Sequence, residues 1–106
     1  MPKYLFEVRY TPAGAAGLMR DGGTKRRAAA AELVESLGGS METMYFAFGD
    51  RDTYAIIDLP NESAAAAASL AVNASGAATG RLTVLLAPEE LDAAARHRVA
   101  YTPPGQ

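Results

Sequence analysis

The clearest indication of the fold is the segment Lys3–Tyr10, which reads KYLFEVRY. Successive side chains of a β-strand point to opposite faces, so this segment has two faces of different character. The first face is wholly apolar and the second mixes apolar and charged groups, with Tyr4, Phe6 and Val8 on the first and Leu5, Glu7 and Arg9 on the second. The segment therefore predicts a strand that is buried on one side only.

The same division recurs in three further candidate strands, at about Met41–Phe48, Thr53–Leu59 and Gly80–Leu86. Their apolar faces carry Met44, Phe46, Phe48, Ala55, Ile57, Leu59, Leu82, Val84 and Leu86. Their mixed faces carry Thr43, Tyr45, Ala47, Tyr54, Ile56, Asp58, Arg81, Thr83 and Leu85. We expect the apolar faces to lie under helices, and the mixed faces to meet water, a ligand or another subunit.

Capping and turn residues divide the rest of the chain into helices and turns. Helices are expected from Thr11-Pro12 to about Arg20, over Lys25–Leu37 with Thr24 as its cap, over Ser63–Asn73, and from Pro88 to about Arg98. The turn Gly49-Asp50-Arg51-Asp52 joins the second and third strands in an antiparallel hairpin. The order β-α-β-β-α-β predicts an α+β, ferredoxin-like fold with a four-stranded antiparallel sheet. We expect this fold to form one domain over residues 1–100, followed by an irregular tail over residues 101–106.

Composition narrows the classes of function. The chain has 106 residues, a formal net charge of -2 and no cysteine, so we expect neither a nucleic-acid nor a membrane partner, and no disulfide or thiolate site. His97 is the single histidine and lies between arginines, which does not make a metal-ligand set. No nucleotide-binding motif indicates a bound cofactor. The start Met1-Pro2-Lys3-Tyr4 lacks a signal-peptide core, so a cytoplasmic protein is expected.

The mixed face of the sheet favours self-association. Two helices cover only one face of a four-stranded sheet, and the other face is too apolar for a comfortable solvent surface. Its apolar and aromatic members are Leu5, Tyr45, Tyr54, Ile56 and Leu85. Pairing two sheets face to face would cover them, so we expect a homodimer or a higher homo-oligomer that encloses a semi-polar cavity.

Several short motifs together resemble the GYD-domain family of small bacterial proteins. They are Tyr10-Thr11, Gly14, Arg26, Leu37-Gly38-Gly39, Gly49-Asp50-Arg51-Asp52 and Pro88-Glu89-Glu90, in this order along nearly the whole chain. The resemblance implies a ferredoxin-like protomer of the dimeric α+β barrel kind, and the biochemical activity of the family is not established. Arg51 stands where the family has its naming tyrosine, so only Gly49, Asp50 and Asp52 carry over from that motif, and such residues are also typical of any hairpin turn.

The candidate ligand-binding residues are those of the mixed face and the turn: Glu7, Arg9, Tyr45, Asp50, Asp52, Tyr54, Asp58 and Arg81. In a partly desolvated cavity Glu7 or Asp58 is a candidate general base, while the alternative is that these carboxylates form salt bridges with Arg9 or Arg81. The basic run Lys25-Arg26-Arg27 is either a solvated helix face or a place where an anion docks.

These residues predict a small-molecule-binding dimeric barrel protein. One alternative is a cofactor-free enzyme of the monooxygenase, isomerase or cyclase type, which rests on analogy of fold alone. The other is a structural or regulatory assembly module. A closed pocket would distinguish the first two from the third, and an acid or base with a shifted pKa beside that pocket would indicate an enzyme.

Overall fold

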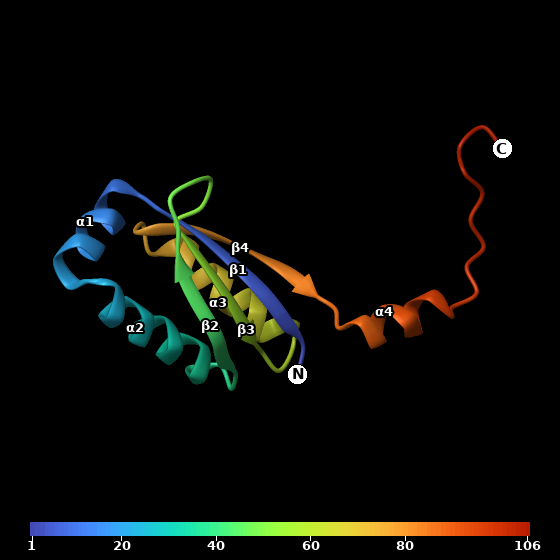
Figure 1. The fold of residues 1–106 in the computed structure, drawn as a ribbon, viewed down its shortest axis with the longest axis horizontal. Helices are drawn as coiled ribbons and strands as arrows, with labels where there is room; N and C mark the ends of the chain where they lie inside the picture. Colours follow the sequence, from blue (N-terminus) through green and yellow to red (C-terminus); the bar gives the residue numbers. More distant parts are fainter.

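A computed structural model describes residues 1–106 as one four-stranded sheet and four helices (Figure 1). The strands are β1 (Lys3–Tyr10), β2 (Ser40–Phe46), β3 (Thr53–Asp58) and β4 (Ala78–Leu85). The helices are α1 (Pro12–Asp21), α2 (Gly23–Ser36), α3 (Glu62–Ala74) and α4 (Pro88–Ala95). All neighbouring strands are antiparallel in the order β2-β3-β1-β4. The predicted α+β, ferredoxin-like class is confirmed.

Local capping explains where the helices begin. The Thr11 hydroxyl accepts the Gly14 N–H at 3.2 Å before α1, and the Asn61 side chain accepts the Ala64 N–H at 2.9 Å before α3. The predicted cap at Thr24 is wrong, because Thr24 lies inside α2. Gly22, at φ 85°, stands alone between α1 and α2, so its left-handed backbone ends one helix and starts the next without a side-chain cap.

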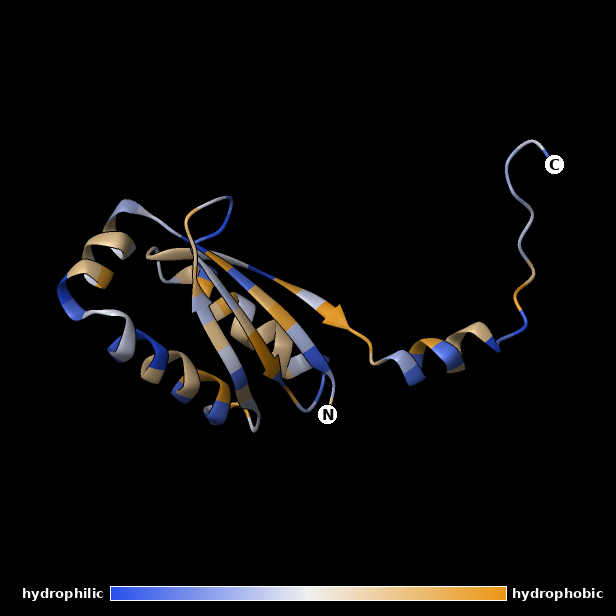
Figure 2. Cartoon of the chain, viewed as in Figure 1, coloured by the Kyte–Doolittle hydropathy of each residue, from blue (hydrophilic) through white to orange (hydrophobic).

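The hydrophobic core lies between the sheet and its covering helices. It is built from nine buried residues: Tyr4, Phe6, Val34, Ala55, Ile57, Leu59, Ala64, Ala65 and Ala68. The strand members alternate with the residues of the open face, as the banded strands of Figure 2 show. The alanines of α3 have little side-chain volume, so this helix packs closely on the sheet. The predicted core faces of β1 and β3 are therefore confirmed.

The helices cover the apolar face of the sheet incompletely. β2 ends at Phe46, earlier than predicted, so Phe48 lies in the following loop with its side chain fully exposed. Val84 and Leu86 are also exposed, because no helix covers the C-terminal end of β4. Phe46, at the end of β2, is 40% exposed as well, so the prediction that these four residues are buried under helices is wrong.

The C-terminal segment extends away from the sheet. α4 and the tail project from the end of β4, and the chain reaches 56 Å along its longest axis (Figure 1). The helix ends at Ala95, before the predicted Arg98, and every residue from Leu86 to Gln106 is exposed. None of the four helices combines the length and the apolar character that crossing a bilayer requires.

Candidate functional site

The mixed faces of the four strands come together on the open side of the sheet. Direct cross-strand pairing joins Tyr45 to Tyr54, Tyr54 to Glu7, and Glu7 to Arg81, which makes one row across the sheet. The next row along the strands consists of Thr43, Ile56, Leu5 and Thr83, which places two aliphatic side chains between two hydroxyls. Four predicted site residues thus share a single row.

Glu7 and Arg81 form the strongest polar contact of this face. Arg81 donates from Nε to Glu7 Oε2 at 2.7 Å and from a terminal nitrogen to Oε1 at 3.4 Å. Glu7 is only 9% exposed. The hydrogen bond from Arg81 lowers the pKa of the Glu7 carboxyl, and the nearby charge of Arg51 adds to this effect. The pairing alternative is confirmed for Glu7, while Arg9 is exposed and forms no ion pair.

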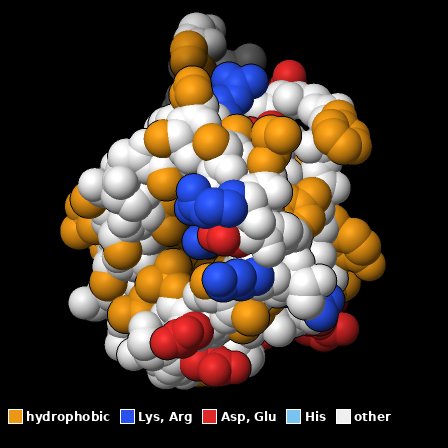
Figure 3. Space-filling view, turned by 90° about the vertical axis from the view of Figure 1, so that its left-hand side faces the viewer, with side chains coloured by type: hydrophobic (Ala, Val, Ile, Leu, Met, Phe, Trp, Pro, Cys, Tyr) orange, Lys and Arg blue, Asp and Glu red, His pale blue; other side chains and the backbone are white.

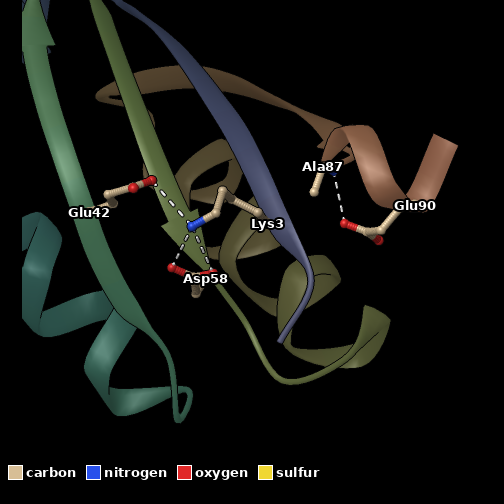
Figure 4. A network of polar contacts seen from close by, with 5 residues as sticks. All are labelled: Lys3, Glu42, Asp58, Ala87 and Glu90. Atoms are coloured by element: carbon tan, nitrogen blue, oxygen red, sulfur yellow. Dashed lines mark hydrogen bonds and ion pairs between the residues drawn. The ribbon is translucent and has the colours of Figure 1, made fainter. Parts of the chain in front are cut away.

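A second charged cluster, which the sequence analysis did not identify, lies at the other end of the open face. Lys3 Nζ lies 3.1 Å from both carboxylate oxygens of Asp58 and 3.2 Å from a carboxylate oxygen of Glu42 (Figure 4). Asp58 therefore pairs with Lys3 rather than with Arg9 or Arg81. The signal in the sequence was the position of Lys3, which alternation places on the same face as Glu7.

Asp52 holds the hairpin turn against β1. Its carboxylate accepts the Tyr10 N–H at 2.8 Å, and its own N–H donates to the Val8 carbonyl at 2.9 Å. Asp50 is exposed in the same turn. The contacts of Asp52 give this residue a part in the fold, and a ligand-binding role for the two aspartates stays a prediction.

Arg51 is a residue that the sequence analysis passed over as a departure from the family motif. Its side chain is half-buried, and its Nε is covered from solvent without a hydrogen-bond partner. Its charge lowers the pKa of Glu7, which brings the turn into the same electrostatic neighbourhood as the Glu7–Arg81 pair.

The opposite face of the sheet contains a cavity of about 560 Å³, between the strands and helices α1, α2 and α3. Its lining is mainly apolar and includes Phe6, Val8, Met41, Met44, Leu33 and Val72. Short side chains such as Ala30 and Ala71 explain the space, because they cannot fill the gap between the helices and the sheet. The sequence predicted a cavity on the open face of a dimer, whereas this cavity lies on the opposite face and within a single chain.

Charged residues line the cavity at one place only, the junction of α1 and α2. They are Arg20, Asp21, Lys25 and Arg26. Arg20 Nε lies 3.4 Å from the Asp21 carboxylate, whereas Lys25 and Arg26 form no ion pair. Figure 3 shows this side of the molecule, with basic side chains beside a hollow lined by hydrophobic ones.

The family model of the GYD domain matches the chain over residues 4–95. The chain belongs to this family. The match runs from β1 through α4, so the open sheet face and the cavity both lie within the GYD domain. No curated protein matches the chain.

Two glycines of the GYD resemblance serve close packing. A Cβ atom on Gly14 would overlap the Ala77 carbonyl oxygen, and one on Gly39 would overlap the Asp58 carbonyl oxygen. These motif positions therefore need glycine for the fold, independently of any ligand.

The Glu7–Arg81 pair predicts a specific dependence of stability on pH. Because the pKa of Glu7 is lowered in the folded chain, its contribution is present above the ordinary value of 4.5 and is lost as the pH falls below it. Glu7→Gln should therefore lower the Tm more at about pH 7 than near pH 3. Circular dichroism melts at both pH values measure this difference.

The matched control is Glu32→Gln, at an exposed residue of α2 without an ion pair. It should leave the Tm within about a degree or two at both pH values, since exposed substitutions rarely matter. An equal loss of Tm at both pH values for Glu7→Gln would show that the ion pair is not its cause.

Proposed function

We propose that this GYD domain is a small-molecule-binding protein whose ligand occupies the cavity between the sheet and helices α1, α2 and α3. The cavity itself is the observation that carries the proposal. Its volume of about 560 Å³ falls within the range of roughly 300–1,000 Å³ that is typical of small-molecule sites. An apolar lining with a few polar groups gathered at one end is also the usual composition of such sites.

Binding accounts for this arrangement better than catalysis does. A cofactor-free enzyme needs a general acid or base within hydrogen-bond reach of its substrate. Glu7 and Asp58, the two candidate bases, both lie outside the cavity, on the other face of the sheet. Arg81 lowers the pKa of Glu7 and so makes it a weaker base, and Asp58 is paired with Lys3. The enzyme alternative therefore receives no support from the position of these carboxylates.

Ligand binding in the cavity can be tested with a neutral probe, 1-octanol. Met41 and Met44 line the cavity, whereas Met19 is 88% exposed on α1 and lies outside it. In protein labelled with ¹³C at the methionine methyl groups, titration with octanol should shift the signals of Met41 and Met44 and leave that of Met19 in place. Unchanged Met41 and Met44 signals at saturating octanol would contradict the proposal.

A cavity-filling variant sharpens this test. Leucine at position 30 would place three more carbon atoms in the cavity, so Ala30→Leu should weaken octanol binding. Ala66→Leu is the control, because Ala66 is exposed on α3 and does not line the cavity. Equal octanol affinity in the two variants would place the ligand elsewhere.

We propose further that the chain forms a homodimer through its open sheet face. Four charges of this face are neutralised within one chain, by the Glu7–Arg81 and Lys3–Asp58 pairs, whereas Arg9, near the end of β1, has no ion pair. Leu5, Ile56 and the exposed Tyr45 remain to make contact, and aromatic residues are enriched in protein interfaces. The predicted ligand-binding residues of the open face would then lie at the contact between subunits.

Ile56→Arg should dissociate the dimer, because it puts an unpaired charge beside Leu5 at the centre of the open face. Light scattering coupled to gel filtration at micromolar concentration should give the mass of a dimer for the wild type and of a monomer for the variant. Ala66→Arg adds the same charge to an exposed position of α3 and should stay dimeric. A monomeric wild type would refute this part of the proposal.

A further inference from the structure

We infer that the ligand of the cavity is an anionic amphiphile, with an apolar body against the sheet and a carboxylate or similar head group beside Lys25 and Arg26. The inference rests on the proposed function and adds the chemical class of the ligand. It comes from the uneven distribution of charge in the cavity lining.

The cavity is apolar at the sheet and charged at one edge. The strands contribute mainly side chains without a strong hydrogen-bonding group, among them Phe6, Val8 and Met44. The polar exception is Tyr10, whose hydroxyl oxygen already accepts a hydrogen bond from the Thr53 hydroxyl at 3.1 Å. All charged lining residues lie within the segment 20–26, where α1 meets α2. A molecule that satisfies both regions must itself have an apolar end and a polar end.

The net positive charge at this edge of the cavity favours an anionic head group on the ligand. Three of its four charged residues are cations, and the single carboxylate, Asp21, pairs with Arg20. Lys25 and Arg26 are left without ion pairs, and the first turn of α2 contains no acidic residue that would neutralise them. A cationic head group would be repelled here, and a neutral head group would gain no ionic interaction with Lys25 or Arg26.

The position of these cations next to an apolar cavity increases their effect on a ligand. Both side chains are exposed, so they approach a head group at the mouth without first being buried. The neighbouring apolar surface displaces water, and electrostatic attraction is stronger where the effective dielectric constant is lower. A guanidinium can also bind a carboxylate through two parallel hydrogen bonds, which favours Arg26 as the main contact.

The test compares octanoate with octanol, which have chains of the same length and differ in the charge of the head group. Octanoate should shift the same Met41 and Met44 methyl signals as octanol. Arg26→Gln should weaken octanoate binding by about tenfold, the loss expected for a charge-assisted hydrogen bond, and change octanol binding by less than about twofold. Lys25→Gln should act in the same direction.

Arg27→Gln is the matched control, since Arg27 follows Arg26 on α2 but lines a second, smaller pocket of about 360 Å³, which shares Met41 and Met44 with the cavity. It removes the same charge and should leave the Kd of octanoate within about twofold. If Arg26→Gln had no effect on octanoate, or no more than Arg27→Gln, recognition of an anion would be refuted while binding in the cavity could stand. If neither probe shifted Met41 and Met44, the proposed function itself would fail.

Discussion

Replacing Leu59 with alanine is expected to lower the free energy of unfolding by about 2–5 kcal/mol, the range for Leu→Ala substitutions in a protein core. Leu59 follows β3 directly and is 0% exposed. Its neighbours in the core include Ala64, Ala65 and Ala68, whose short side chains cannot move in to fill the space that the substitution leaves. Only 12 of the 106 residues are buried, so each large core side chain matters strongly to this chain.

Leu70→Ala provides the matched control, because Leu70 is 71% exposed on α3. The same substitution there should change the free energy of unfolding by less than about 0.5 kcal/mol. Urea unfolding followed by circular dichroism, at one fixed protein concentration, compares the two variants. Similar losses for both would contradict the burial of Leu59 under the helices.

Alternation along the strands was sufficient to predict the sheet and its two faces. Lys3–Tyr10 was predicted with its observed bounds, and Phe6 and Ile57 occupy the core as expected. A shift of one residue would exchange the two faces of a strand, so a strongly alternating sequence specifies its own orientation. The predictions failed at strand ends such as Phe48, where burial depends on how far a covering helix extends.

At the junction of α1 and α2, a valid general preference for helix-capping residues predicts the wrong start of the second helix. Threonine is a favoured helix cap, and this preference predicts a cap at Thr24. The chain instead changes direction at the single residue Gly22. The second helix then starts at Gly23, before Thr24. Sequence alone does not show which of two adjacent starting points the packing of α2 will select.

The candidate site was only partly accessible from the sequence. The Glu7–Arg81 pair was one of the predicted alternatives, because both residues fall on the same face of neighbouring strands. The cavity was missed, since its size depends on the distance between alanine-rich helices and the sheet. Lys25 and Arg26 had been considered as an anion site, but their relation to an apolar cavity follows only from the fold.

Gly39→Ala is expected to destabilise the chain by about 1–3 kcal/mol or more, the cost of forcing extra volume into a packed region. A Cβ at this position would overlap the Asp58 carbonyl oxygen and lie 2.9 Å from Leu59 Cδ2. Neither neighbour can move away easily. Asp58 is paired with Lys3 of β1 across the sheet, and Leu59 is fully buried, so relief of the overlap requires a shift of the α2–β2 connection against the sheet.

The GYD-type turn supplies the control for this prediction. A Cβ on Gly49 would meet no atom within 4 Å, and Gly49 does not have a positive φ. Gly49→Ala should therefore be neutral or slightly stabilising, by up to about 1 kcal/mol, because alanine restricts the unfolded chain. Urea unfolding of both variants compares one substitution at two motif glycines. A large loss at Gly39 with none at Gly49 would assign Gly39 to packing, whereas an equal loss at both would contradict the close contact between Gly39 and Asp58 that the fold requires.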